Sequence, residues 1–235
     1  MIDIRRGRER GTADLDWLKS YHTFSFGQYY DPRHMNFGPL RVINEDVIQP
    51  GQGFGTHGHK NMEIITYVLE GALEHRDSLG NGSIIKPGDV QRMTAGTGIQ
   101  HSEYNPSLSD PVHLLQIWIV PDAEDLEPGY EQVRLSADQP FNHLYLIGAK
   151  KSRQGAVTIH QQVDLYAAQL SRQGTVVHPM PVQRKAWLHV AKGAIQLNGK
   201  HDLIAGDAAA ISNSHEITVH GQSESAEIIL FDMVT

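Results

Sequence analysis

Two stretches of sequence decide the fold: GQGFGTHGHKNMEIITYVLEG at residues 51–71 and PGDVQRMTAGTGIQHSEYN at residues 87–105. Each stretch holds two polar side chains that are two positions apart, His57 with His59 and His101 with Glu103. In a β-strand, side chains two positions apart point to the same face of the sheet. If the two strands are neighbours, three imidazoles and one carboxylate meet at one point. Such a group is a ligand set for a divalent transition metal.

The rest of the chain, from Leu40 onwards, consists of short apolar or alternating segments separated by turn signals. Pro50-Gly51, Glu70-Gly71 and Pro87-Gly88 are examples, and the 22 glycines of the 235-residue chain suit such a number of turns. Short strands with frequent glycine are typical of an antiparallel sandwich or jelly roll. We therefore expect an all-β fold.

The N-terminal part of the chain is less regular. Ile2–Arg5 is interpreted as an edge strand, and Tyr21–Phe26 alternates aromatic and polar residues as a half-buried strand does. Between them, Asp14–Ser20 is expected to form a short helix capped by Asp14 or Asp16. The segment YYDPRHMNFGP at residues 29–39 has the composition of a loop.

An internal echo indicates a duplication. TYVLEGALEHRDSLGNGSIIKPGDVQRM at residues 66–93 and LHVAKGAIQLNGKHDLIAGDAAAI at residues 188–211 share the order strand, Gly, strand, turn, strand, Gly-Asp, strand. The acidic, proline-bounded segment at residues 121–128 is interpreted as a linker. We therefore expect a metal-binding domain at residues 1–124 and a related domain without the metal motif at residues 125–235.

Composition excludes several classes of protein. With 20 Lys and Arg against 27 Asp and Glu, the net charge of −7 is unlike that of a protein that grips nucleic acid through its phosphates. The absence of cysteine excludes disulfides, thiolate metal sites and cysteine nucleophiles. The longest nearly apolar run, at residues 112–120, is too short to span a bilayer. No apolar stretch near the N-terminus resembles a signal peptide, so we expect a cytoplasmic protein without membrane contact.

The quoted stretches resemble a known family. The pattern Gly51-x5-His57-x-His59-x3-Glu63 is similar to the first cupin motif, and Gly96-x-Gly98-x2-His101-x3-Asn105 is similar to the second. The phrases THGHKNMEIITYVLEG and MTAGTGIQHSEYN resemble the signatures of the pirin family, which supplies its acidic ligand from the second motif. The resemblance runs through nearly the whole chain.

The resemblance implies two tandem cupin barrels (a bicupin) with one metal in the N-terminal barrel. The implied metal ligands are His57, His59, His101 and Glu103. Fe(II) is the expected metal, although a site of this type also accepts Cu, Ni, Mn, Co or Zn.

Bacterial pirins are associated with quercetin 2,3-dioxygenase activity. The resemblance therefore implies a metal-dependent dioxygenase that opens the heterocyclic ring of a flavonol with O2 and releases CO. Eukaryotic pirin is associated with transcription-factor binding and iron-dependent redox sensing, so a metal-dependent module that binds a protein partner is the alternative. A cupin isomerase or hydrolase acting on a small polar substrate is a third hypothesis. We expect a monomer.

Individual residues receive roles on chemical grounds. Glu103 is the expected base for the flavonol hydroxyl, and Glu63 and Gln116 are expected to hold N–H groups of the ligands. Three further histidines are interpreted as structural: His22, His75 and His113. Four apolar side chains placed near the site favour an aromatic substrate: Phe24, Phe26, Met35 and Phe54. Because ligand imidazoles must be neutral, metal loss is expected near the ordinary imidazole pKa of about 6–6.5.

Overall fold

The computed structural model describes residues 1–135, 140–151, 153 and 155–234. Strands dominate the described residues, and the one short helix is a 3-10 turn, η1 (Gly7–Glu9). The expected all-β class is confirmed. The chain forms two compact units: the first unit comprises Gly11–Ser136 with Lys151–Gln161, and the second unit comprises Met1–Arg10, Ala137–Lys150 and Gln162–Thr235. Among the described residues, no helix has the length and apolarity needed to cross a membrane.

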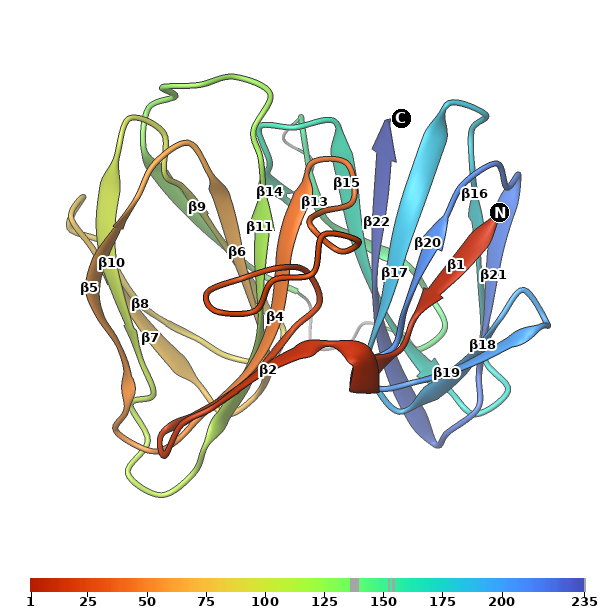
Figure 1. Ribbon diagram of the computed structural model, residues 1–235, viewed down its shortest axis with the longest axis horizontal. Coiled ribbons are helices and arrows are strands. Elements are labelled where there is room, and N and C mark those ends of the chain that lie inside the picture. The colour runs from red at the N-terminus through yellow and green to blue at the C-terminus, as the bar shows by residue number, and fades with distance from the viewer. Residues whose placement is uncertain (136–139, 152, 154, 235) are drawn as a thin grey trace. The chain divides into compact units, whose positions relative to one another are not determined.

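The first unit is built from two antiparallel sheets, drawn in red to green in Figure 1. Its larger sheet has the strand order β12-β9-β6-β11-β4-β3-β2, and its smaller sheet has the order β5-β10-β7-β8. The strands of these two sheets are β2 (Gly11–Asp14), β3 (Leu18–His22), β4 (Leu40–Ile48), β5 (Gly53–His59), β6 (Glu63–Glu70), β7 (Leu73–Asp77), β8 (Gly82–Ile85), β9 (Asp89–Thr94), β10 (Ile99–Tyr104), β11 (Val112–Ile119) and β12 (Gly129–Arg134). The two-residue strand β14 (Val157–Thr158) also belongs to the first unit but to neither of these sheets.

Apolar side chains from both sheets fill part of the space between them. One cluster contains Ile48, Leu73 and Ile85, which come from β4, β7 and β8. Burial of such side chains stabilises the unit by roughly 1.5–3 kcal/mol each. Other inward positions carry polar side chains, including Thr66 on β6 and Gln116 on β11, both of which are buried. The interior of this barrel is therefore apolar around Leu73 and polar around Thr66 and Gln116.

The expected helix at Asp14–Ser20 is wrong. Residues 11–22 form the β2–β3 hairpin, closed by reciprocal main-chain hydrogen bonds between Leu15 and Leu18. β3 then pairs with β4 along its length, with Leu18 opposite Ile48. A short helix is only marginally stable by itself, so pairing with the long strand β4 decides the local structure.

The second unit repeats the two-sheet plan. Its larger sheet contains the order β1-β20-β17-β22-β15-β13, and its smaller sheet has the order β16-β21-β18-β19. The strands of the second unit are β1 (Ile2–Arg5), β13 (Tyr145–Ala149), β15 (Val163–Ser171), β16 (Thr175–Pro179), β17 (Arg184–Lys192), β18 (Ala194–Leu197), β19 (His201–Ile204), β20 (Ala208–Ile211), β21 (Glu216–Gly221) and β22 (Ser225–Val234). Its core is a large buried apolar cluster that includes Leu188, Ile195 and Leu230.

The compact units differ from the division expected at residue 124. β12 follows the expected linker but pairs with β9 of the first unit, with Tyr130 opposite Met93. The 121–128 segment is itself tied to the first unit, because its Leu126 carbonyl accepts a hydrogen bond from the main-chain N–H of Thr97. At the other end, Ile2–Arg5 pairs with β20 of the second unit. Strand pairing thus joins segments that a sequence boundary separates.

Candidate metal centre

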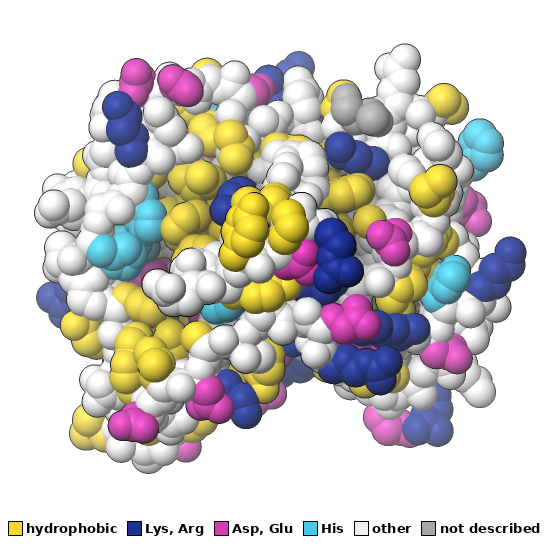
Figure 2. All heavy atoms as spheres, viewed as in Figure 1, with side chains coloured by type: hydrophobic (Ala, Val, Ile, Leu, Met, Phe, Trp, Pro, Cys, Tyr) yellow, Lys and Arg dark blue, Asp and Glu magenta, His cyan; other side chains and the backbone are white. Residues whose placement is uncertain are grey.

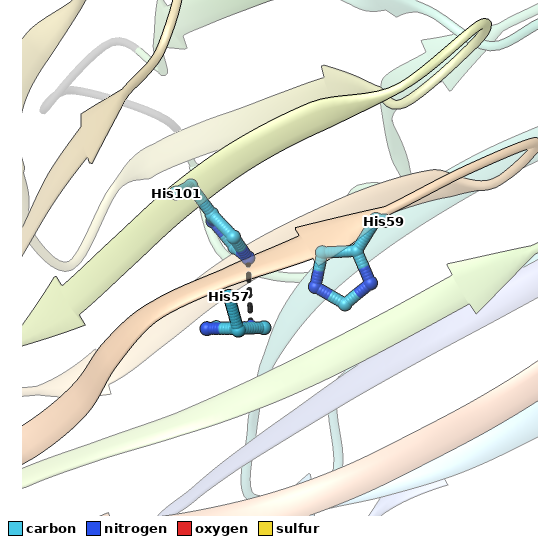
Figure 3. Close-up of side chains that lie close together, drawn as sticks. All are labelled: His57, His59 and His101. Atoms are coloured by element: carbon cyan, nitrogen blue, oxygen red, sulfur yellow. Dashed lines mark hydrogen bonds between the residues drawn. The ribbon is translucent and has the colours of Figure 1, made fainter.

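Three imidazoles from two neighbouring strands converge in the first unit. His57 and His59 lie on β5 and His101 lies on β10, and Figure 3 shows their rings gathered on one side of these strands. One potential ligand atom from each ring lies within 4.8 Å of those of the other two. The Nε2 atoms of His57 and His101 are 3.1 Å apart. The two-position spacing of the histidines on β5 therefore does place both on one face, as the sequence indicates.

A β-bulge sets the orientation of His57. His101 lies opposite His57 in the β5–β10 pair, but Glu103 lies opposite Phe54, so β5 has one more residue than β10 between these two positions. The carbonyl of Gly55 in this bulge accepts a 2.8 Å hydrogen bond from Nδ1 of His57. Because Nδ1 then carries the proton, the lone pair of the neutral ring is on Nε2, which faces His101.

Burial favours neutral imidazoles at this site. His101 is buried and His59 is half-buried. Desolvation, followed by the neighbouring imidazoles His101 and His57, lowers the pKa of His59 to about 4. Desolvation and the neighbouring rings of His57 and His75 lower the pKa of His101 to about 3. At neutral pH both rings are therefore in the form that binds metal ions.

Glu103 lies beside the triad and is held by the opposite sheet. Its carboxylate is buried, and each of its two oxygens accepts a 3.0 Å hydrogen bond from Nε2 of Gln116. Thr66 donates a longer 3.5 Å hydrogen bond to the same group. Glu103 forms a second potential ligand group with His101 and His75, so His101 is shared between two groups. The structure thus places Gln116 against the carboxylate and not against an imidazole.

Glu63 contacts His160 and does not make the expected contact with the imidazoles of the triad. Its carboxylate is buried, and it accepts hydrogen bonds from the main-chain N–H and the Nδ1 atom of His160. Glu63 and Thr66 are three positions apart on β6 and therefore point to opposite faces of the sheet. Since Thr66 faces Glu103, Glu63 faces away from the imidazoles. The expected contact between Glu63 and the ligands is a wrong prediction.

His75 is the residue that sequence reasoning missed. It is fully buried on β7, where it lies opposite Glu103 of β10. Its Nε2 atom is 3.1 Å from a carboxylate oxygen of Asp77. The alternation His75-x-Asp77, on a strand adjacent to the one that carries His101 and Glu103, was the available signal. By contrast, His22 and His113 are bonded to Asn44 and Glu45, in keeping with structural roles.

Aromatic side chains border the imidazoles. The ring of Trp118 packs edge-on against His59 at 5.0 Å between centroids, and Phe26 packs against Trp118 at 5.4 Å. The ring centroids of Phe54 and His57 are 6.4 Å apart. In Figure 2, histidine side chains of the first unit reach the surface beside hydrophobic ones. Of the other apolar residues expected here, Phe24 is buried and Met35 is half-buried in the loop before β4.

The donors present fit a divalent transition metal. Three imidazoles face one another and a buried carboxylate lies alongside, which is the donor chemistry of non-haem iron, nickel, copper and zinc sites. The buried Nδ1 atom of His101 has no hydrogen-bond partner among the described residues. This is the atom that would carry the proton if Nε2 of His101 bound a metal. The described residues therefore contain a His/Glu cluster that can bind a metal.

Comparison with known families agrees with the two-unit plan. Residues 3–119 match the family model described as Pirin, and residues 146–233 match the model described as the quercetinase C-terminal cupin domain. The two matches account for one cupin domain in each half of the chain. The expected pair of cupin domains is therefore confirmed.

Individual relatives cover the whole chain. A protein from Escherichia coli O157:H7 named quercetin 2,3-dioxygenase is 48% identical over 99% of both chains. The crystal structure of YhhW from Escherichia coli has a TM-score of 0.94 and 46% identity, and covers 99% of this chain and 97% of its own. A crystal structure of the bacterial pirin YhhW from Escherichia coli in complex with nickel(II) has a TM-score of 0.93 and 46% identity, and covers 100% of this chain and 99% of its own. The chain belongs to the pirin family.

Proposed function

We propose that this chain is a metal-dependent dioxygenase that opens the heterocyclic ring of a flavonol with O2 and releases CO. One observation supports it most directly: a triad of imidazoles, two of them half-buried and one buried, has a buried carboxylate and aromatic side chains beside it. The names of relatives such as the 48% identical quercetin 2,3-dioxygenase agree with this choice. In the overall reaction, two oxygen atoms enter the flavonol and one ring carbon leaves with one oxygen as CO.

The proposed ligands are His57, His59, His101 and Glu103. A divalent metal at such a site makes a bound hydroxyl more acidic and brings O2 chemistry to an aromatic substrate. Fe(II) is our first choice of metal, and the nickel(II) complex of the related YhhW makes Ni(II) the second to test. Glu103 groups with His101 and not with the full triad, so as a ligand it has to turn from Gln116 towards His57 and His59.

Glu103 is also the proposed proton acceptor. The 3-hydroxyl of the flavonol would transfer its proton to a carboxylate oxygen of Glu103, leaving an electron-rich enolate that O2 can attack. In the described conformation Gln116 donates N–H to both carboxylate oxygens, and this contact opens when Glu103 turns towards the imidazoles. The buried position of Glu103 excludes bulk water from this transfer.

The aromatic border is the proposed substrate contact. Trp118 and Phe54 flank the imidazoles on two sides, and aromatic rings pack favourably edge-on or offset against one another. A flat flavonol would lie against these rings with its hydroxyl directed at the imidazoles. This chemistry favours an aromatic substrate over the small polar substrate of a cupin isomerase or hydrolase.

The test is oxygen uptake and CO release with quercetin, using protein stripped of metal and reloaded separately with Fe, Mn, Co, Ni or Cu. We expect one CO for each O2 consumed, and loss of turnover in His59→Ala. His113→Ala, which changes a histidine bonded to Glu45 and outside the cluster, should retain turnover. Metal binding without turnover in every form would reject the dioxygenase and favour the redox-sensing, partner-binding module.

A further inference from the structure

His75 lies behind the imidazole triad and has no part in the function proposed above. Its ring is fully buried between His101, at 5.3 Å between centroids, and Tyr130, at 5.0 Å. The Nδ1 atom of His75 is buried and has no hydrogen-bond partner among the described residues. A buried polar atom without a partner costs free energy, so its position calls for an explanation.

Asp77 orients the ring of His75 through Nε2. One oxygen of Asp77 accepts hydrogen bonds from the main-chain N–H groups of Leu79 and Asn81, and the side-chain amide of Asn81 donates to both oxygens. The turn between β7 and β8 therefore holds the carboxylate rigidly. Since a carboxylate accepts, Nε2 of His75 donates at 3.1 Å. In the neutral form of this ring the lone pair is on Nδ1.

The tautomer of His101 follows from its contact with His57. Nδ1 of His57 donates to Gly55, so Nε2 of His57 has the lone pair and accepts across the 3.1 Å contact. In this arrangement Nε2 of His101 carries the proton, and its Nδ1 atom has a lone pair. Both Nδ1 atoms then have a lone pair, which agrees with their lack of a hydrogen-bond partner among the described residues.

Metal binding reverses this situation. When Nε2 of His101 binds a metal ion, the proton of the neutral ring has to be on Nδ1. The buried Nδ1–H then needs an acceptor. The potential ligand atoms of His75, His101 and Glu103 lie within 4.8 Å of one another, and His75 is the one of these two neighbours of His101 that is not itself a proposed metal ligand. The His57–His101 pair places two ring nitrogens 3.1 Å apart at a centroid separation of 4.5 Å. The rings of His75 and His101 are 5.3 Å apart between centroids, so the proposed Nδ1 to Nδ1 contact requires the two rings to turn towards each other.

We propose that His75 is a positioning residue of the metal centre: held by Asp77, it accepts the Nδ1–H of His101 when Nε2 of His101 binds a metal ion. The inference rests on the metal site of the proposed function but not on its reaction. Partners of this kind fix the orientation of a ligand ring, and their loss typically weakens metal binding by roughly 10- to 100-fold.

The first experiment reads the tautomers in the wild-type protein by ¹⁵N NMR of the histidine rings, with and without Zn(II). We expect His75 to be protonated at Nε2 in both states. We expect the proton of His101 to move from Nε2 to Nδ1 on zinc binding, and to exchange slowly with water. A proton on Nδ1 of His75 in the zinc-loaded protein would overturn the inference, and this measurement needs no variant to fold.

The second experiment measures the Kd for Ni(II) and Zn(II) by chelator competition in His75→Phe and His75→Gln. We expect weakening of roughly 10- to 100-fold in His75→Phe, with part of it restored by the carbonyl acceptor in His75→Gln. His113→Phe is the matched control, because it removes another histidine bonded to a carboxylate, and its Kd should be unchanged.

Two results would overturn the inference here. An unchanged Kd in His75→Phe would remove the positioning role. Loss of one imidazole from the nickel X-ray absorption spectrum of His75→Phe would make His75 a ligand, as its grouping with His101 and Glu103 also allows. Either result leaves metal binding by the wild-type protein intact and therefore rejects this inference alone. Wild-type protein that binds no metal would instead reject the proposed function as well.

Discussion

The Nε2 atoms of His57 and His101 lie 3.1 Å apart although the residues are 44 positions apart in the chain. Pairing of β5 with β10 puts the two backbones opposite each other, and the bulge at Gly55 turns Nε2 of His57 inwards. Two imidazole nitrogens at this distance share either one proton or one metal ion. The contact therefore links strand register directly to the proposed chemistry.

Metal retention should extend to lower pH than an ordinary imidazole allows. The pKa of His59 is lowered to about 4 and that of His101 to about 3, mainly by burial. Protons then compete with metal at these two positions only as the pH falls towards 4. We expect metal content, measured after dialysis at stepped pH, to persist at pH 5 and to fall between about pH 4 and 3.

This expected pH range replaces the metal loss at about pH 6–6.5 that unperturbed histidines would give. Because the unfolded chain has its ordinary imidazole pKa values, it binds protons before the folded chain does. The free energy of unfolding of the metal-free protein therefore decreases as the pH falls from about 6.5 to about 3. Half-loss of metal near pH 6 would contradict the expected retention at pH 5.

Gln116→Leu should destabilise the first unit and disturb Glu103. The change removes the side-chain amide that donates to both carboxylate oxygens and leaves a buried charge without its main partner. We expect a loss of roughly 1–3 kcal/mol in the free energy of unfolding, measured in denaturant without metal. Gln196→Leu, where the amide donates to Asp202 at the surface, should change stability by less than about 0.5 kcal/mol. Equal effects would contradict the role of Gln116.

Gly53 and Gly58 form a matched pair on β5. A Cβ at Gly53 would collide with the main-chain oxygen of Glu103 and lie 2.6 Å from Cα of Tyr104, whereas a Cβ at Gly58 would lie 3.7 Å from the nearest atom. Gly53→Ala should force β5 and β10 apart and cost roughly 1–3 kcal/mol or more. Gly58→Ala should be neutral or slightly stabilising. Metal affinity should fall only in Gly53→Ala, and equal behaviour of the two variants would rule out this close approach.

Asp46 makes stability depend on pH in the opposite direction to His59 and His101. Its carboxyl is buried, and desolvation is the main cause that raises its pKa to about 7, with the charges of Glu103 and Glu45 adding to the effect. Between about pH 4 and 7 the unfolded chain loses this proton before the folded chain does, so stability falls as pH rises. Asp46→Asn should therefore be more stable, relative to wild type, at pH 8 than at pH 4. A constant difference across this range would contradict the raised pKa.

Sequence spacing is sufficient to find the central cluster, because His57 with His59 depends on strand periodicity alone. The roles of Glu63 and His75 were missed because they depend on which strands pair and which face of the sheet each side chain occupies. Glu63 is in the first motif, but its position on β6 turns it to the opposite face from Thr66. His75 joins the cluster only through the pairing of β7 with β10, which sequence separation conceals.

The N-terminal residues show the same limit. Asp14–Ser20 has the composition of a capped helix, but β4 presents a free edge along which β3 pairs. Likewise, Ile2–Arg5 is recognisable as a strand, while its partner β20 lies about 200 residues away in the chain. Local pattern therefore predicts element type more reliably than it predicts the partner that completes a sheet.

The most direct test is anomalous diffraction at the nickel edge from crystals of the Ni(II)-loaded protein. We predict one strong peak in the first unit, bounded by the imidazoles of His57, His59 and His101, with Glu103 turned from Gln116 to complete the ligand set. A peak elsewhere, for example at the buried His178–Asp232 pair of the second unit, with none at the triad, would contradict the proposed metal centre and the function built on it.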